Sequence, residues 1–247
     1  MMWAVEEERT PEGTVVAAVV SLLSAPVMTA REVARQLGMS PTTLTQWLEG
    51  GERRGQWYEP VLRAEPLGHV NMTWGEIVES QYLRAYRSHV SMQRLRPFIR
   101  EMREAFDAPY PLAHDRPYLD HNRSLVVELQ EKSDLPDSLL LVMSGRRKGQ
   151  YLLNPLVQND FLQRVEFDDA GDRAALRFRP HGKGSPVVID PEFSSGASTV
   201  RGIRTDVLSG LVSAGEQVDD VATEFGLVPA DVREACAYEW GKNPQAA

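Results

Sequence analysis

The chain has 247 residues, of which 42% are hydrophobic and 25% charged, and its formal net charge is −8 at pH 7. These proportions are typical of a soluble globular protein, and the length is sufficient for two or three small domains. The net charge excludes a protein that coats nucleic acid nonspecifically, although a sequence-specific binder with a local basic face fits it. The single cysteine, Cys236, excludes an internal disulfide framework and a cysteine-based zinc site. We expect it to pack in a core, in a protein of the reducing cytoplasm.

The first apolar segment is Val15–Leu23. It is far shorter than the roughly 20 residues that a membrane span needs. Three glutamates precede it, whereas a signal peptide begins with basic residues. We therefore expect a buried helix that begins after Thr14 and ends before Pro26, and no membrane association.

The next stretch, Glu32–Trp47, has the sequence EVARQLGMSPTTLTQW. Thr29 and Glu32 have the spacing of a capping box, so a helix should begin at Ala30. Ser40 followed by Pro41 is typical of a second helix start. The apolar residues that should form one buried face are Val33, Ala34, Leu37, Leu44, Trp47 and Leu48. With a turn at Gly38 between the helices, this pattern predicts a helix-turn-helix.

The residues after Leu48 read EGGERRG, and their glycines predict a tight turn. A turn after a recognition helix can be a wing whose arginines contact phosphate, and the alternative is a solvated surface turn. Short polar side chains on the second helix can reach base edges without repelling phosphate. The residues that we expect to contact DNA are Arg31, Arg35, Ser40, Thr42, Thr43, Thr45, Gln46, Arg53 and Arg54.

Two further helices follow. Thr73 and Glu76 form a second capping-box pattern, a break is expected near residues 89–91, and the next helix should cover Met92–Phe106. Six arginines lie between residues 81 and 103, against the single Glu101: Arg84, Arg87, Arg94, Arg96, Arg100 and Arg103. We expect them opposite the apolar stripe of these helices, either as a solvated face or as a second phosphate contact.

A proline-rich connector covers residues 107–122, and the pattern of apolar residues changes from residue 124. Short apolar or alternating runs bounded by turn residues predict a small β-rich domain. The predicted strands are residues 125–129, 139–143, 151–153, 164–167, 174–178 and 186–189.

A second stretch, Asp220–Ala235, repeats the pattern of the helix-turn-helix as DVATEFGLVPADVREA. Its apolar residues, glycine and proline occupy the same register, so the two units should have similar geometry. Their charge differs, because eight carboxylates from residue 205 onward face only Arg233 and Lys242. Bringing those carboxylates to a polyanion is unfavourable, so we interpret the second unit as a packing or partner module.

The segment from Val187 to Trp240 resembles a small antitoxin-like domain. The residues that carry the resemblance are Asp190-Pro191, Gly196, Arg201-Gly202-Ile203-Arg204 and Gly215, followed by the helices. Ala197-Ser198 stands where that family often has a proline. The resemblance implies a strand before three helices, and a dimer or partner contact through Arg201, Gly202, Ile203, Arg204 and Thr205.

The N-terminal part resembles the MerR-type and excisionase-type winged helix-turn-helix. Both ends together, with a β-rich middle, resemble the large VapB-type antitoxins of type II toxin–antitoxin pairs. That resemblance implies a partner, a PIN-domain ribonuclease toxin encoded nearby, and repression of the shared operon by a homodimer bound to operator DNA.

We find no pattern that predicts an enzyme, a metal site or a cofactor. The glycines of residues 145–149 lack the strand and helix of a phosphate-binding loop. The five histidines have no metal-ligand spacing, and His114 and His121 lie in the proline-rich connector. The acidic residues Asp160, Glu166, Asp168, Asp169 and Asp172 could bind Mg²⁺, but they surround a predicted hairpin turn, where acidic residues are common.

The expected fold class is α+β, mainly α. The expected domains are a winged helix-turn-helix with a helical extension (residues 14–106), a β-rich middle domain (124–189) and a strand with a three-helix module (190–240). The function that we predict is that of a dimeric antitoxin that represses its own operon. The alternatives are a ligand-responsive MerR-like regulator with the middle domain as sensor, and an interaction scaffold.

Overall fold

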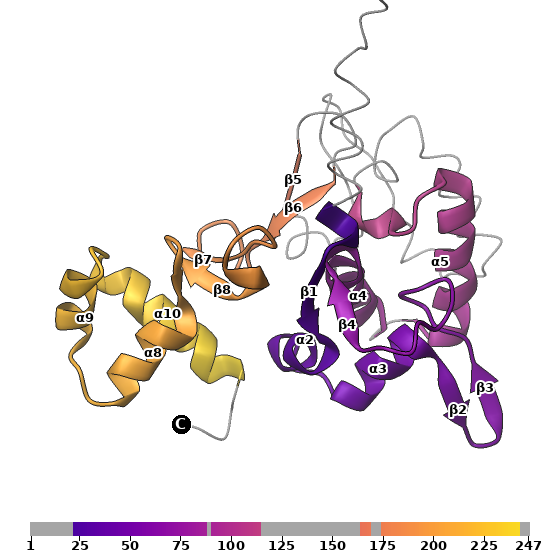
Figure 1. The fold of residues 1–247 in the computed structure, drawn as a ribbon, viewed down its shortest axis with the longest axis horizontal. Helices are drawn as coiled ribbons and strands as arrows, with labels where there is room; N and C mark the ends of the chain where they lie inside the picture. The colour runs from indigo at the N-terminus through magenta and orange to yellow at the C-terminus, as the bar shows by residue number, and fades with distance from the viewer. Residues whose placement is uncertain (1–21, 88–89, 115–163, 169–173, 243–247) are drawn as a thin grey trace, which may run out of the picture.

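A computed structural model describes residues 22–87, 90–114, 164–168 and 174–242. In this part of the chain, helices combine with short antiparallel strands (Figure 1). Residues 22–114, here called the N-terminal body, contain β1 (Pro26–Thr29), α2 (Ala30–Gln36), α3 (Pro41–Glu49), β2 (Gly51–Arg53), β3 (Gln56–Tyr58), β4 (Asn71–Thr73), α4 (Trp74–Arg87), α5 (Met92–Phe106) and the 3-10 helix η1 (Pro111–Ala113). Residues 22–24 are helical, and the rest of the apolar helix predicted from residue 14 lies outside the described residues.

Two capping boxes begin helices of the N-terminal body. The N–H of Thr29 donates to Glu32 Oε2 at 2.8 Å, and the N–H of Glu32 donates to Thr29 Oγ1 at 3.4 Å. Thr73 and Glu76 make the same reciprocal bonds at 2.8 and 3.3 Å. Each arrangement satisfies N–H groups that a helix start leaves without partners, and both predictions are confirmed. The strands that precede these helices, β1 and β4, pair antiparallel, which the sequence analysis did not predict.

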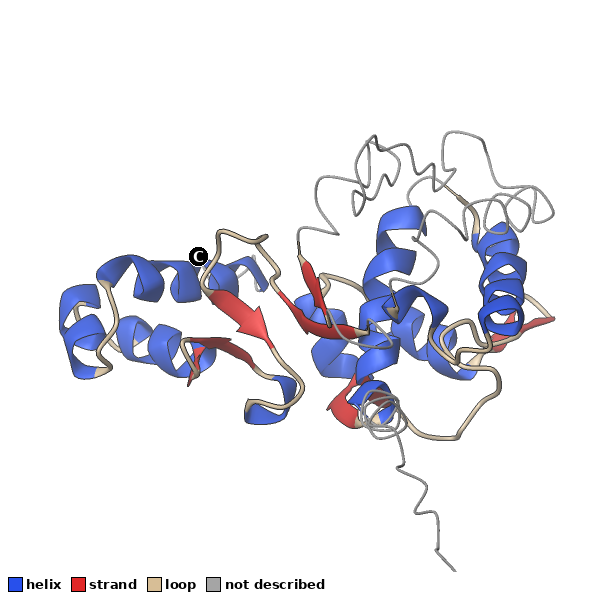
Figure 2. Ribbon diagram, turned by 90° about the horizontal axis from the view of Figure 1, so that it is seen from above, coloured by secondary structure: helices blue, strands red, loops and turns tan. Residues whose placement is uncertain are grey.

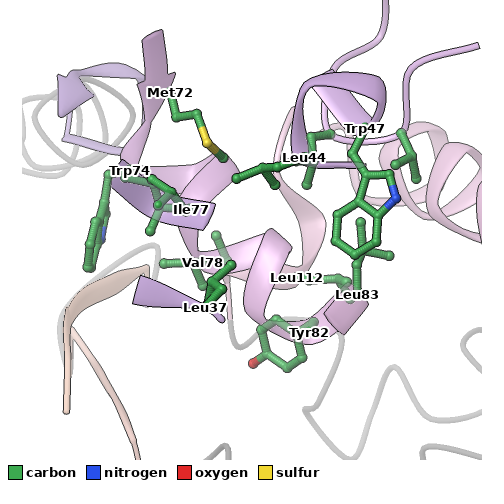
Figure 3. Close-up of a cluster of buried hydrophobic side chains, with 14 of the residues drawn as sticks. Leu37, Leu44, Trp47, Met72, Trp74, Ile77, Val78, Tyr82, Leu83 and Leu112 are labelled. Carbon is green, nitrogen blue, oxygen red and sulfur yellow. The ribbon is translucent and has the colours of Figure 1, made fainter. Parts of the chain in front are cut away.

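The core of the N-terminal body is built from the faces that the sequence analysis predicted to be buried. Figure 3 shows Leu37, Leu44 and Trp47 of the helix-turn-helix among side chains of α4. Trp74, at the start of α4, is fully buried, and its Nε1 donates to the carbonyl oxygen of Ala175 at 2.7 Å. This bond joins α4 to a strand about a hundred residues later in the chain.

The second half of the described chain is a sheet followed by helices. Its elements are β5 (Val165–Phe167), β6 (Ala175–Phe178), β7 (Val187–Ile189), the 3-10 helix η5 (Ser194–Gly196), β8 (Ser198–Val200), β9 (Ile203–Arg204), α8 (Thr205–Ser213), α9 (Val218–Glu224) and α10 (Pro229–Lys242). The five strands pair in chain order, each antiparallel to the next. We call α8, α9 and α10 the C-terminal module.

The sheet lies between the N-terminal body and the C-terminal module (Figures 1 and 2). Val165 and Phe178 pack in the core of the N-terminal body, whereas Val187 and Val200 pack against α8, α9 and α10. The predicted domain boundary between residues 189 and 190 therefore falls inside one sheet, between β7 and β8. The predicted strands at 164–167, 174–178 and 186–189 are present as β5, β6 and β7. Those at 125–129, 139–143 and 151–153 lie outside the described residues.

The C-terminal module repeats the geometry of α2, the turn and α3. Leu37 N–H donates to Val33 at 2.9 Å and Met39 N–H to Ala34 at 2.8 Å. The equivalent bonds from Phe225 to Val221 and from Leu227 to Ala222 measure 3.1 and 2.8 Å. The glycines of the two turns, Gly38 and Gly226, have φ of 59° and 66°, which only glycine adopts without strain. The predicted likeness of the two units is confirmed for the backbone. In the described part of the chain, no helix is both long and apolar enough to cross a membrane.

Candidate nucleic-acid interface

Helix α3 has one buried face and one polar face. Leu44, Trp47 and Leu48 are buried and hold the helix against the core. Thr42 is exposed, while Thr43, Thr45 and Gln46 are partly exposed on other sides of the helix. Pro41 is the first helical residue, as predicted, but the side chain of the N-cap residue Ser40 makes no capping hydrogen bond. The exposed Ser40 hydroxyl is therefore not occupied in capping α3.

The residues after α3 form an antiparallel hairpin, β2 and β3, in which Arg53 pairs with Gln56. The two residues of its turn, Arg54 and Gly55, have φ of 55° and 73°. Positive φ at both positions is the geometry of a type I′ turn, which matches the twist of a two-residue hairpin. The hairpin extends beyond α3 (Figure 1), and Arg53 and Arg54 are exposed. The predicted turn is thus the turn of an ordered hairpin, which lies after the second helix, where a wing would lie.

A hollow of about 420 Å³ lies where α3, the hairpin, the end of α4 and the start of α5 meet. Its lining residues are Thr43, Gln46, Trp47, Gly50, Gly51, Arg53, Arg54, Tyr58, Arg87, Met92, Gln93 and Arg96. Four of these residues are arginines and none is acidic. We call it the α3–hairpin hollow. Its charge favours an anion, and Gln46 offers both a donor and an acceptor at its wall.

Two arginines of the hollow lie over aromatic rings at the distance of a cation–π contact. The Cζ atom of Arg87 lies 6.0 Å from the centroid of the Trp47 ring, and that of Arg96 lies 5.9 Å from the Tyr58 ring. Arg96 is half-buried, and burial lowers the pKa of its guanidinium against opposing effects of Glu59 and Tyr58. A contact of this kind limits the orientations of the guanidinium.

The remaining predicted DNA contacts do not all face this hollow. Arg31 is exposed near the start of α2, and Thr42 is exposed at the start of α3. Arg35 instead lines two other hollows, one with Arg84, Arg164 and Tyr238 and one with residues of η5, β8, α8 and α10. Of the nine predicted residues, Thr43, Gln46, Arg53 and Arg54 converge on the α3–hairpin hollow. Arg35 lies on the side of α2 toward the C-terminal module.

The six arginines of residues 81–103 do not form a single face opposite the apolar stripe, which corrects that prediction. Arg87 and Arg96 line the α3–hairpin hollow, and Arg84 lines the hollow beside Arg35. Arg103 is largely buried: its Nη2 donates to the carbonyl oxygen of Val61 at 2.6 Å and to Glu79 Oε2 at 3.2 Å. A helical period tells which residues oppose the core of one helix but not which other segments cover them.

A buried ion-pair network ties α3 to α4. Arg63 bonds the carboxylates of Glu49, at the end of α3, and Glu76, in α4. It also donates to the carbonyl oxygens of His69 and Asn71, each at 2.8 Å. The loop that follows the hairpin is therefore held by one guanidinium. The role of Arg63 could not be predicted from the sequence, because its partners come from three separate segments.

The predicted partner-contact residues form the β8–β9 turn and its flanks. Arg201 and Gly202 have φ of 49° and 86°, and their two-residue turn is of the same type as that of the N-terminal hairpin. Arg201 Nε bonds Asp231 Oδ2 at 2.7 Å. Thr205 is fully buried, where its hydroxyl bonds Ser198 and Glu239. Arg201, Gly202 and Arg204 are exposed, whereas Ile203 is partly buried and Thr205 is buried within the module.

Cys236 is buried in the core of the C-terminal module, as predicted, and burial raises the pKa of its thiol. Among the described residues, no three His, Cys, Asp or Glu side chains are placed to hold a metal ion. Asp160, Asp169 and Asp172 lie outside the described residues, and Glu166 pairs with Arg179 at 2.5 Å.

In the described part of the chain, two short helices joined by a turn are followed by a hairpin with exposed arginines, and a sheet joins this body to a helical module. Residues 187–238, from β7 into α10, match a family model described as "Protein of unknown function (DUF433)". This match covers nearly the same segment as the antitoxin-like resemblance seen in the sequence.

Two proteins of Mycobacterium tuberculosis (strain ATCC 25618 / H37Rv) are similar over most of their length. The "Uncharacterized protein Rv2308" is 33% identical over 226 residues, which cover 89% of this chain and 92% of that protein. The "Putative antitoxin VapB45" is 28% identical over 225 residues, which cover 85% and 92%. The chain belongs to the family of Rv2308.

A crystal structure of Rv2018 from Mycobacterium tuberculosis has a similar fold. Its TM-score is 0.65 at 27% sequence identity, and the superposition covers 85% of this chain and 97% of that one. The similarity thus extends over both the N-terminal body and the C-terminal module.

Proposed function

We propose that this protein is an antitoxin that binds operator DNA through α3 and the hairpin. The observation that carries the DNA-binding part is the α3–hairpin hollow, where polar side chains of α3 and arginines of the hairpin converge without a carboxylate in the lining. Arginines at the rim would contact phosphate, and Gln46 with the threonines of α3 would contact base edges in the major groove. The nine residues predicted from the sequence remain our candidates for DNA contact.

The antitoxin part is supported by similarity and by charge. The relative named "Putative antitoxin VapB45" is similar over 85% of this chain. The C-terminal module is acidic, with Asp219, Asp220 and Glu224 exposed on α9. Helix α9 lies at the far end of the molecule from the hairpin (Figure 1). Such a module suits a basic partner surface, so a PIN-domain ribonuclease encoded nearby could bind it while α3 stays accessible.

The protein would act as a homodimer that represses its own operon in the cytoplasm. A dimer reads two half-sites about one helical turn apart, so the operator should be palindromic. Within this proposal, residues 14–106 supply DNA binding and residues 190–240 supply dimer or toxin contacts. The β-rich region between them joins the two through the shared sheet. No catalytic step is assigned to any residue.

Base reading is tested with Gln46→Ala, compared with Gln217→Ala in the C-terminal module as a matched control. The Gln46 variant should lose about 1–3 kcal/mol of discrimination between operator and random DNA, because a bidentate amide contact is worth that much. The Gln217 variant should lose none. Equal weakening of both DNAs by Gln46→Ala would remove the base-reading role from Gln46.

The partner is tested by co-expression with the adjacent reading frame and sizing by light scattering. A stable complex supports the antitoxin proposal. A lone dimer that binds no neighbour favours the second candidate, a ligand-responsive regulator.

One observation favours that second candidate. A hollow of about 240 Å³ between the N-terminal body and α10 is lined by Arg35, Arg84, Arg164, His181 and Tyr238, among others. Three arginines beside aromatic rings suit an anionic small molecule. A rise in melting temperature with such a ligand, abolished by Arg84→Gln, would support this function.

A further inference from the structure

The proposed DNA contacts lie on α3 and the hairpin, yet a third wall of the α3–hairpin hollow is basic too. Arg87 comes from the end of α4 and Arg96 from the first turns of α5. Neither residue belongs to the helix-turn-helix or to the hairpin. Because both residues are basic, the ligand expected at this wall is an anion.

We infer that Arg87 and Arg96 bind a backbone phosphate of the same DNA, so that the junction of α4 and α5 forms a second phosphate clasp opposite the hairpin. This inference rests on the proposed DNA-binding function. It extends that function to two residues outside α3 and the hairpin.

Arg96 is the stronger of the two candidates for anion binding. Among the described residues, neither its Nε nor its Nη1 has a hydrogen-bond partner, although both atoms are shielded from solvent. Shielded donors of a charged group without partners are costly, and a small shift of the side chain that brings them to a phosphate oxygen would satisfy them with charge-assisted hydrogen bonds. Glu59 is the acidic residue that acts on Arg96 electrostatically, but it is exposed and does not line the hollow.

The geometry also prepares Arg87 and Arg96 for a fixed anion. Each lies over a ring at cation–π distance, Arg87 over Trp47 of α3 and Arg96 over Tyr58 of β3. Such a contact limits the rotamers of a long side chain, so less entropy is lost when it binds. A phosphate between the clasp and the hairpin would therefore fix the register of α3 on the duplex.

The occupant should be a duplex rather than a buried small anion. The hollow is rimmed by exposed side chains of Arg53, Arg54 and Gln93, so a polyanion can enter from outside without being enclosed. Met92 and Gln93, the first residues of the 15-residue helix α5, also line it. The positive end of a helix dipole at this rim adds to the attraction of phosphate.

The test measures how the affinity for operator DNA depends on salt. Each phosphate contact adds about 0.9 to the slope of log affinity against log salt concentration. Arg96→Gln should lower that slope by about 1, so that affinity falls about fourfold less between about 50 and 200 mM salt. Arg100→Gln, an exposed arginine one turn further along α5, is the matched control and should leave the slope unchanged.

Arg96→Lys separates a phosphate contact from a packing role. Lysine keeps the positive charge but not the planar guanidinium, so its slope should stay near that of the wild type. An unchanged slope in Arg96→Gln, or the same loss in Arg96→Lys and Arg96→Gln, would overturn the clasp while DNA binding itself stands. Absence of DNA binding by the wild-type protein would instead overturn the proposed function together with the clasp.

Discussion

The guanidinium of Arg63 is the single group whose removal should most affect the geometry of the interface. It is 5% exposed and bonds Glu76, which is 1% exposed, along with Glu49 and two backbone carbonyls. Substitution with methionine keeps much of the volume but leaves the Glu76 carboxylate buried without a cation. Breaking a buried pair from one side costs about 3–5 kcal/mol.

This loss is large beside the roughly 5–15 kcal/mol that stabilises a typical domain. Urea unfolding of Arg63→Met should therefore show a midpoint shifted strongly toward low denaturant with an unchanged m-value. Because Glu76 is the group left uncompensated, Arg63→Met/Glu76→Gln should recover about 1–3 kcal/mol relative to the sum of the two single losses. Arg100→Met, at an exposed site, should change stability by less than about 0.5 kcal/mol.

Two results would refute this reasoning. A loss below about 1 kcal/mol in Arg63→Met would mean that water or a neighbouring group compensates Glu76. Strict additivity in the double variant would mean that Arg63 acts through packing and not through the carboxylate.

Two further predictions concern Glu79 and the contact between η5 and β1. Burial raises the pKa of Glu79 from 4.5 to about 7, against the opposing effects of Arg103 and of the Leu112 N–H. The folded state therefore binds this proton more tightly than the unfolded state, so the free energy of unfolding should fall by up to about 3 kcal/mol as pH rises from about 4.5 through 7. Glu79→Gln should flatten this pH dependence in urea titrations, and an unchanged slope would contradict it. Gly196 has φ of +72°, and a Cβ there would lie 2.0 Å from Val27 Cγ1, so Gly196→Ala should cost about 1–3 kcal/mol or more. Gly202→Ala, at φ +86° with open space around it, is the matched control for backbone strain alone, and equal losses at the two sites would mean that the contact with Val27 adds nothing.

The parts of the fold that the sequence predicted are those fixed by local spacing. Two capping boxes, the turn at Gly38 and the repeat of the same unit near Gly226 depend on residues within a few positions of one another. The tight turn after α3 was predicted from its glycines in the same way, whereas the two strands that flank it were not. These features could be predicted because the residues that determine them lie close together in the chain.

The parts that could not be predicted depend on contacts across the chain. The pairing of β1 with β4 involves short strands without a clear alternation, and the Trp74 bond to Ala175 joins residues far apart in sequence. Single-sequence periodicity carries no information on such pairings. The continuation of the sheet across residue 190 was missed for the same reason.

The candidate site shows the same division. The polar residues of α3 and the arginines of the hairpin were predicted, because helix-turn-helix spacing places them. Arg87 and Arg96 also line this hollow. The sequence did not distinguish them from the other arginines, because both belong to a run of six. Their different roles follow from tertiary packing: Arg96 lies in the hollow beside the hairpin, whereas Arg103 forms a buried ion pair.

The most direct test of the central claim compares the affinity of the full-length protein for DNA upstream of its own reading frame with its affinity for random DNA of equal length. Both are measured at the same near-physiological salt concentration, since affinity without a stated salt concentration has no meaning here. The proposal predicts that the upstream DNA binds at least about 10³-fold more tightly, as in sequence-specific complexes, and that Gln46→Ala reduces this ratio. Equal affinity for both DNAs, or no binding at any salt concentration, would contradict it.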